Sequence, residues 1–346
     1  MSKFRQTKFN LLIILVFMAG IFFSCGRQPE ANSEQKSVNP DSLNQDVNLL
    51  TNAIIKNPDK TAPYLERAQY YIKKEMFNEA LQDVNKALSL DEKDARVYTT
   101  LSDVYLYSGK TQKALDALKK AATLAPEDAD IDVKTARLFL TMSDYKQTFN
   151  YLREALKKDR DNAEAFFISG LANEEMGDTV KAIDSYQQTV ARDQKHYDAL
   201  KQLGILFSIK RDKLAIDYLR NAAQLRPVQP EPLYVLGMFY QENNEPDRAL
   251  SVYNEILQID SSFKLAFYNK GYVYLVYKQE YLNAVEAFTQ AINLDQDYAE
   301  ALYNRGYAYE LLGDRNKARS DYQKVLRLKL NDDKAITGLN RLDAAQ

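Results

Sequence analysis

The chain of 346 residues contains no tryptophan, one cysteine and one histidine. A single cysteine excludes an intramolecular disulfide, and His196 is the only side chain that ordinarily titrates near neutral pH. His196 falls between two segments of a repeating pattern, so we expect a solvated loop residue there rather than a catalytic base. The sequence contains neither a glycine-rich phosphate loop nor a cysteine and histidine cluster with metal-ligand spacing. We therefore expect a protein that is not an enzyme and needs no cofactor.

Charge of either sign is not in excess. The 46 lysines and arginines nearly balance the 48 aspartates and glutamates, the net charge is −2, and the two signs are interspersed. Binding to a nucleic-acid backbone requires a basic surface. Adjacent carboxylates such as Glu174 and Glu175 would point to different sides of a helix, so they do not form a catalytic pair. We expect neither a nucleic-acid partner nor a small-molecule substrate.

A pattern of 34 residues recurs eight times between Thr61 and Asp332. With Thr61 counted as position 1, positions 8 and 20 carry a small residue in every copy. Position 8 reads Ala68, Ser102, Ala136, Gly170, Gly204, Gly237, Gly271 and Gly306, and position 20 reads Ala80, Ala114, Thr148, Ala182, Ala215, Ala249, Ala284 and Ala318. Small side chains are needed where two helix axes approach closely. Positions 8 and 20 are therefore predicted to be the contacts within a pair of helices.

The apolar spacing within each copy predicts the two helices. Positions 4, 7, 8 and 11 form a helical stripe, as Tyr98, Leu101 and Tyr105 illustrate, and this stripe marks the buried face of a first helix. Turns that begin with Gly109 or Gly177 separate the first helix from the second. No segment alternates with period two, so we expect no strands. The fifth copy is one residue short and the seventh one residue long, and we place both changes in the turns between paired helices.

These copies resemble the tetratricopeptide repeat. The clearest match is Leu233-x-x-Leu236-Gly237-x-x-Tyr240, followed by Ala249 and Tyr253. The resemblance implies an all-α fold, a right-handed α-solenoid of helix-turn-helix repeats that continues as one stack. We predict eight repeats over residues 61–332. A capping half-repeat is expected at 42–60 and a capping helix at 333–346.

The amino terminus differs from the repeats. Lys3, Arg5 and Lys8 precede thirteen apolar or small residues, 11–23, as in a secretory signal peptide. Such a stretch spans about 20 Å as a helix, less than the roughly 30 Å of a hydrocarbon core, which disfavours a membrane-spanning helix. Ser24 and Cys25 follow it directly. Residues 1–24 therefore resemble a bacterial lipoprotein signal peptide, although an ordinary leader with an incidental cysteine remains an alternative.

The lipoprotein resemblance implies that the Cys25 thiol receives a diacylglycerol and that its amino group is acylated after cleavage. Several acyl chains make an anchor stable, because each buried methylene contributes about 0.8 kcal/mol. Residues 25–41 contain one valine and no aromatic residue, and they read as a flexible tether. Gly26, at the second mature position, resembles proteins that are sent to an outer membrane. We expect a protein lipid-anchored in a bacterial cell envelope, with the outer membrane as its location.

Positions 2, 5, 6, 9 and 12 of tetratricopeptide first helices face a concave groove, and the last three copies place tyrosine and asparagine there. The predicted partner-binding residues are Tyr234, Tyr268, Asn269, Tyr272, Tyr303, Asn304 and Tyr307. An amide can donate to and accept from a peptide backbone, and tyrosine is a frequent interface anchor. We expect a protein or peptide segment as the partner. The alternative, that these tyrosines pack against neighbouring repeats, remains open.

The expected function is that of a non-catalytic scaffold for an envelope, secretion or pilus complex. The alternative is a glycan-binding envelope lipoprotein. Such proteins present aromatic platforms on long inserted loops, whereas the copies here follow one another without insertions.

Overall fold

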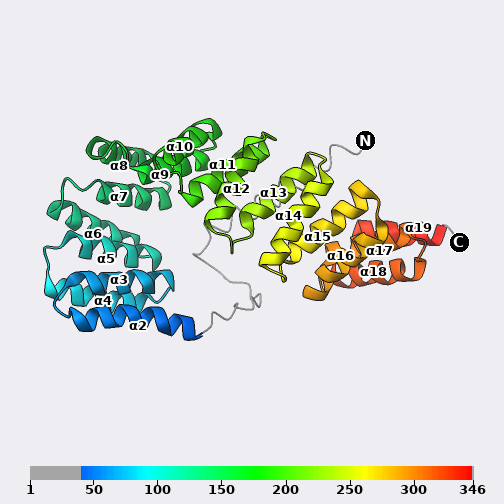
Figure 1. The fold of residues 1–346 in the computed structure, drawn as a ribbon, viewed down its shortest axis with the longest axis horizontal. Coiled ribbons are helices and arrows are strands. Elements are labelled where there is room, and N and C mark those ends of the chain that lie inside the picture. Colours follow the sequence, from blue (N-terminus) through cyan, green and yellow to red (C-terminus); the bar gives the residue numbers. More distant parts are fainter. Residues whose placement is uncertain (1–39, 345–346) are drawn as a thin grey trace. The chain divides into compact units, whose positions relative to one another are not determined.

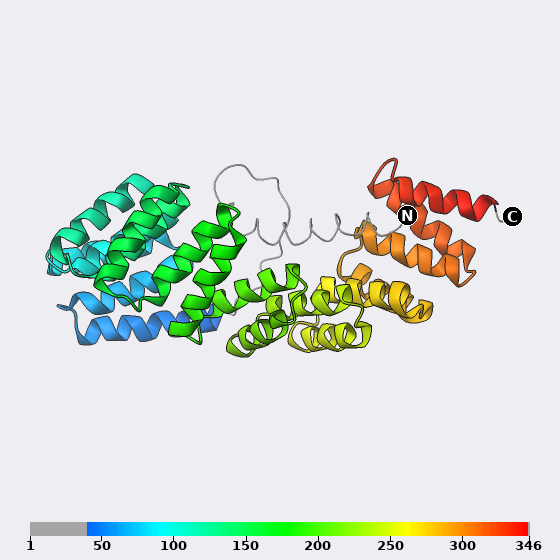
Figure 2. The same ribbon diagram turned by 90° about the horizontal axis from the view of Figure 1, so that it is seen from above.

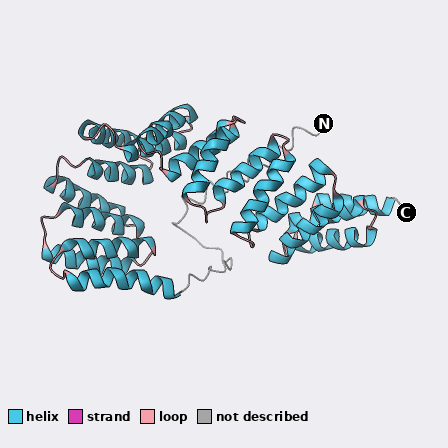
Figure 3. Ribbon diagram, viewed as in Figure 1, coloured by secondary structure: helices cyan, strands magenta, loops and turns pink. Residues whose placement is uncertain are grey.

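The computed structural model describes residues 40–344, and the side chains from Asp46 onward. In this range the chain forms eighteen α-helices, α2 to α19, and one π-helical segment, η1, with no strand (Figure 3). The predicted all-α fold is therefore confirmed. The predicted signal peptide, Cys25 and most of the predicted tether lie outside the described residues.

The sixteen helices α3 to α18 form eight consecutive hairpins (Figure 1). The first helices are α3 (Thr61–Lys73), α5 (Ala95–Tyr107), α7 (Ala129–Thr141), α9 (Ala163–Glu175), α11 (Tyr197–Ile209), α13 (Glu231–Glu242), α15 (Lys264–Tyr272) and α17 (Ala299–Leu311). The second helices are α4 (Phe77–Leu90), α6 (Thr111–Leu124), α8 (Tyr145–Lys158), α10 (Thr179–Arg192), α12 (Leu214–Leu225), α14 (Pro246–Ile259), α16 (Tyr281–Leu294) and α18 (Arg315–Leu328). The helix α2 (Pro40–Lys56) precedes the hairpins and α19 (Asp333–Ala344) follows them.

The chain divides into two compact units. The first ends at Lys158 and contains the described helices α2 to α8, and the second begins at Asp159 and contains α9 to α19. Within each unit every first helix packs against the second helix of its own hairpin. First helices of successive hairpins also contact each other, as α3 and α5 do in the first unit and α11 and α13 in the second. In both units the first helices therefore share one side of the stack.

Position 8 is small because a larger residue would collide with the second helix. A Cβ atom added to Gly170 would lie 2.4 Å from Cε1 of Tyr186, and one on Gly237 would lie 2.5 Å from Cε1 of Tyr253. Both aromatic residues occupy position 24 of their repeat and are fully buried. In the third repeat, where position 24 is the smaller Leu152, position 8 is an alanine. A glycine at position 8 thus provides the space that an aromatic ring at position 24 fills, although Gly204 also faces a leucine, Leu219.

Position 15 adopts the left-handed backbone conformation in all eight turns. The residues are Glu75, Gly109, Ser143, Gly177, Arg211, Asn244, Gln279 (the aligned residue of the longer seventh repeat) and Gly313, with φ between 55° and 81°. Only three of them are glycine, the residue that adopts this conformation without steric cost. The N–H of the next residue bonds back to position 11, as from Met76 to the Tyr71 carbonyl at 2.9 Å. One turn geometry therefore serves repeats with and without the predicted glycine.

The two changes in repeat length do not lie in these turns, so that prediction was wrong. In the seventh repeat the extra residue widens the first helix into η1 (Val273–Lys278), and the Glu280 N–H still bonds to the Tyr274 carbonyl. In the fifth repeat the missing residue is absent from the first turn of α12. There the Ala215 N–H donates to the Asp212 carbonyl, three residues earlier. The corresponding Ala80 N–H bonds back four. Both changes thus leave the turn intact and alter a helix instead.

Buried ion pairs of identical spacing occur in the first and eighth repeats. Arg67 donates two hydrogen bonds of 2.7 Å to the Asp83 carboxylate, and Arg305 donates two of 2.8 Å to Asp321. Each arginine also donates to a threonine of the preceding helix, Thr51 or Thr289. Such forked pairs fix the relative position of three helices.

Candidate functional site

The predicted position-5 tyrosines pack between repeats. Tyr234 is 4% exposed and Tyr268 is 9% exposed. Their ring centroids lie 5.6 Å from Phe263 and 5.2 Å from Tyr298, which are the last residues before the next first helices. Burial raises the pKa of the Tyr234 hydroxyl to about 12, and its hydrogen bond from Asn269 only partly offsets this.

The predicted asparagines connect adjacent repeats. Nδ2 of Asn269 donates to the Tyr234 hydroxyl at 3.1 Å, and Nδ2 of Asn304 donates to the Tyr268 hydroxyl at 3.0 Å. Each amide therefore already uses a donor on the tyrosine of the preceding repeat. Of the residues predicted to bind a partner, Tyr234, Tyr268 and Asn269 are buried, whereas Tyr272, Tyr303, Asn304 and Tyr307 are half-buried. Partner binding by these seven residues stays a prediction.

Position 9 distinguishes the two units. In the second unit it carries five half-buried apolar or aromatic residues in succession, Leu171, Ile205, Met238, Tyr272 and Tyr307. We call these five residues the position-9 row. In the first unit the same position carries Gln69, Asp103 and Arg137. Because equivalent positions of stacked repeats lie beside one another, the row gives the first-helix side of the second unit a partly exposed apolar strip.

A tyrosine at position 24 pairs with a glutamate or glutamine at position 12 in three repeats of the second unit. The Tyr186 hydroxyl donates to Oε2 of Glu174 at 2.7 Å, Tyr253 to Oε1 of Gln241 at 3.1 Å and Tyr322 to Oε2 of Glu310 at 2.6 Å. The fifth and seventh repeats have Leu219 and Phe288 opposite Gly204 and Gly271, and these side chains have no hydroxyl. These pairs were not predicted from the sequence, although a tyrosine at position 24 coincides there with a glutamate or glutamine at position 12.

The two glutamates of these pairs have opposite electrostatic environments. Arg341 of α19 donates to both Glu310 oxygens, at 2.7 and 2.8 Å. Burial alone would raise the pKa of the Glu310 carboxyl, but the hydrogen bonds and charge of Arg341 lower it overall. Burial raises the pKa of the Glu174 carboxyl, and only the hydrogen bond from Tyr186 opposes this. Oε1 of Glu174 is buried and has no hydrogen-bond partner.

His196 is not a solvated loop residue, so that expectation was wrong. Its side chain is 14% exposed, and its ring lies 4.6 Å from that of Phe167. Nδ1 accepts the backbone N–H of Ala199 and so caps α11, while Nε2 lies 3.3 Å from Oε2 of Glu164. The junction places the imidazole where an unsatisfied helix N–H needs an acceptor.

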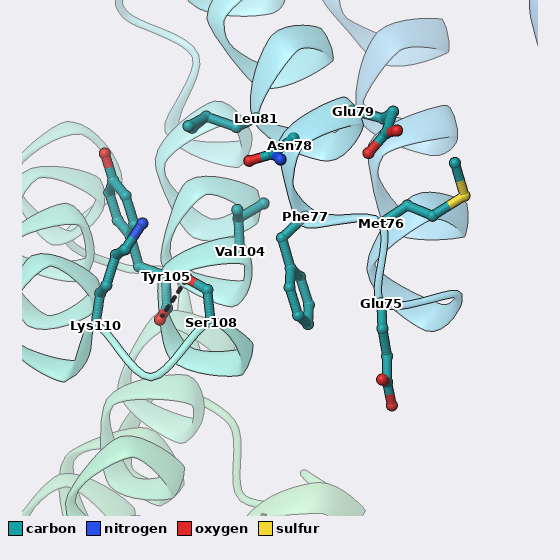
Figure 4. Close-up of a pocket in the computed structure, with 10 residues that line it drawn as sticks. All are labelled: Glu75, Met76, Phe77, Asn78, Glu79, Leu81, Val104, Tyr105, Ser108 and Lys110. Atoms are coloured by element: carbon teal, nitrogen blue, oxygen red, sulfur yellow. Dashed lines mark hydrogen bonds between the residues drawn. The ribbon is translucent and has the colours of Figure 1, made fainter. Parts of the chain in front are cut away.

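A small hollow of about 260 Å³ lies between the first two repeats, on the side of their turns (Figure 4). Phe77, Leu81 and Val104 line it, together with Tyr105 and Lys110. It is smaller than sites that bury drug-sized ligands, which occupy roughly 300–1,000 Å³. In the range 40–344 no group of three acidic, histidine or cysteine side chains could hold a metal ion. None of the helices in that range is long and apolar enough to span a bilayer.

Four family models match the chain, and two of the matched ranges overlap. The TPR domain of cytochrome c-type biogenesis protein H matches residues 66–196, and tetratricopeptide-repeat models match 230–263, 275–313 and 299–332. These stretches coincide with hairpins in both units.

Known proteins with similar sequences include BBSome complex member BBS4 of Bos taurus, 27% identical over 49% of this chain and 33% of its own length. DnaJ homolog subfamily C member 3 of Gallus gallus is 22% identical over 72% of this chain and 46% of its own length. The chain thus spans less than half of these relatives. A solved structure, the C-terminal part of a TPR repeat-containing protein from Cytophaga hutchinsonii, covers 80% of this chain and 99% of its own at 20% identity, with a TM-score of 0.49.

The matched stretches, the eight hairpins and the small residues at positions 8 and 20 agree with one another. The chain is therefore an all-α protein built of tetratricopeptide repeats.

Proposed function

We propose that this protein is a non-catalytic scaffold, lipid-anchored in a bacterial cell envelope, that binds a protein or peptide segment along the first-helix side of its second unit. The observation that carries the proposal is the position-9 row. Five successive repeats keep an apolar or aromatic side chain half-buried at one position, whereas the first unit places polar residues there. An exposed apolar strip with polar borders is typical of an interaction surface.

The chemistry of the row favours a protein partner. Tyr272 and Tyr307 combine apolar area with a hydroxyl and little rotamer freedom, as interface anchors do. Glu231 and Glu300 lie at position 2 of their repeats and add acidic groups at the border. The relative in Bos taurus is named as a member of a protein complex, which is consistent with this proposal.

A comparison of surface variants tests the binding site. The full-length protein would be crosslinked in its host envelope and purified, and co-purified proteins would be quantified for wild type and for Tyr272→Ala. The control is Tyr107→Ala, which removes a 60% exposed tyrosine from the first unit. We expect Tyr272→Ala to reduce recovery of a discrete partner at least tenfold, because loss of a hot-spot tyrosine costs about 2 kcal/mol or more. If the same amount of partner is recovered with all three proteins, the position-9 row is not the binding site.

The anchor has an independent test. The proposal rests on Cys25, which directly follows the apolar stretch. Cells would be grown with an alkyne-labelled fatty acid, and the purified protein would be assayed for label. We expect label in wild type, none in Cys25→Ala, and release of the variant from the membrane fraction. An unlabelled wild-type protein would contradict lipidation without bearing on the position-9 row.

A further inference from the structure

The end of the second unit contains a basic side chain bound to the first-helix side of the stack. Arg341 lies on α19, which packs against α17 and α18 (Figure 2, orange to red). Its guanidinium forms a forked pair with Glu310, lies within 3.5 Å of the Tyr322 hydroxyl and stands 5.5 Å from the ring centroid of Tyr307. Counted from Asp333, Arg341 occupies position 9 of the capping helix.

The fourth repeat contains the same acceptor without the cation. Glu174 and Tyr186 occupy positions 12 and 24, as Glu310 and Tyr322 do, and form the same hydrogen bond. The residue equivalent to Arg341, position 9 of the next first helix, is Ile205, which carries no charge. Oε1 of Glu310 accepts from Arg341, whereas Oε1 of Glu174 has no hydrogen-bond partner. A buried carboxylate oxygen without a donor is costly, and a guanidinium would satisfy it.

We propose that Glu174 accepts an arginine side chain of the bound segment, whose apolar side chains lie on the position-9 row. The inference rests on the proposed function and adds the partner's chemistry, a segment with apolar residues and at least one arginine. Leu171 is the position-9 residue of the helix that carries Glu174. It corresponds to Tyr307, the position-9 residue of the helix that carries Glu310, which lies beneath Arg341. The alkyl part of the arginine would pack on Leu171 while its head group reaches Glu174.

The sequence provides a conservative variant and a matched control. In the sixth repeat Gln241 accepts from Tyr253 as Glu174 accepts from Tyr186, so Glu174→Gln retains the hydrogen bond and loses only the charge. Glu175→Gln removes the same charge one residue later, at an exposed position.

Peptide selection on the full-length protein tests the proposal directly. A displayed library of random 12-residue peptides would be selected against wild type, Glu174→Gln and Glu175→Gln. We expect wild type and Glu175→Gln to enrich peptides with arginine beside apolar residues, and Glu174→Gln to lose the arginine enrichment and weaken binding of wild-type peptides about tenfold. Arginine enrichment that persists in Glu174→Gln, or that never appears, would overturn this inference while leaving peptide binding in place. Failure to enrich any peptide would contradict the proposed function itself.

A second measurement needs no partner. Ile205→Arg places a guanidinium at the position that Arg341 has relative to Glu310. Thermal unfolding would be measured for Ile205→Arg in the wild-type and Glu174→Gln backgrounds. If Glu174 is a free acceptor, the substitution raises the melting temperature only when Glu174 is present, and it reduces arginine-peptide binding. An equal effect in both backgrounds would show that a cation at this place does not reach Glu174.

Discussion

Tyr186 donates a 2.7 Å hydrogen bond to Glu174, whose second carboxylate oxygen is buried without a hydrogen-bond partner. Tyr186 is itself fully buried, and it occupies the space that Gly170 leaves by having no side chain. One glycine, one tyrosine and one carboxyl thus form a single unit that links both helices of the fourth repeat. The same arrangement recurs with Gly306, Tyr322 and Glu310.

Replacing Glu174 by glutamine should stabilise the protein at neutral pH. Burial raises the pKa of Glu174 above its ordinary value of 4.5. A group whose pKa is raised on folding contributes stability at pH values below its ordinary pKa, and this contribution is lost as the pH rises through the folded-state pKa. The charged form of Glu174 is therefore unfavourable at pH 7.5. We expect Glu174→Gln to gain about 1 kcal/mol at pH 7.5 and little at pH 4.5, measured by urea unfolding.

Glu310→Gln should have the opposite sign and serves as the comparison. Arg341 lowers the pKa of Glu310 despite its burial, so the stability it contributes is present above the ordinary pKa and is lost as the pH falls. The variant should therefore be less stable than wild type at pH 7.5, with the difference shrinking at acid pH. Identical pH profiles for the two variants would mean that Arg341 does not distinguish the two carboxyls.

Gly170→Ala should destabilise the fourth repeat, because the added Cβ would lie 2.4 Å from the ring of Tyr186. Overpacking of this kind costs about 1–3 kcal/mol. The triple variant Gly170→Ala, Glu174→Leu, Tyr186→Leu should recover part of the loss, since Ala136, Leu140 and Leu152 form this combination in the third repeat. Calorimetry of the wild type and the two variants tests both statements. A triple variant no more stable than Gly170→Ala would show that contact with the Tyr186 ring is not the cause.

Ser143→Gly should stabilise the first unit. Ser143 is exposed and has φ of 56° at position 15, whereas Gly177 has φ of 79° at the same position of the next repeat. A left-handed conformation costs a non-glycine residue about 1 kcal/mol. We expect Ser143→Gly to gain, and Gly177→Ala to lose, about 1 kcal/mol in urea unfolding. Changes of the same sign would contradict the role assigned to position 15.

Arg305→Met should be strongly destabilising, by about 3 kcal/mol, because it leaves the Asp321 carboxylate buried without its forked partner. The double variant Arg305→Met, Asp321→Leu should recover most of the loss, since no charge then stays buried. Urea unfolding of the three proteins provides the test. If the single and double variants lose equally, packing rather than the charge of Asp321 accounts for the effect.

The period of the sequence was sufficient to predict the hairpins and their contacts, because positions 8 and 20 are constrained by one distance between helices. It could not place the extra residue of the seventh repeat. The spacing between Gly271 and Ala284 shows that one residue is inserted between them. Either the turn or the first helix can accommodate this residue, and in the structure it lies in the π-helical segment η1.

Side-chain direction limited the prediction of the site. Positions 5 and 6 were expected to face a partner, yet Asn269 of the seventh repeat donates a hydrogen bond to Tyr234 of the sixth. Whether a side chain points outward or toward the next repeat depends on how far successive hairpins rotate, which a single repeat does not encode. At position 9, Tyr272 and Tyr307 are half-buried, and partner binding by them stays a prediction.

Site-specific photocrosslinking can show directly which side of the second unit contacts the partner. A benzoylphenylalanine would replace Met238, in the middle of the position-9 row, or Asn254, which is exposed on the second helix of the same repeat. After irradiation of intact cells, we expect a discrete crosslinked protein from position 238 and none from position 254. Crosslinks of equal yield from both positions, or from position 254 alone, would contradict binding on the first-helix side of the second unit.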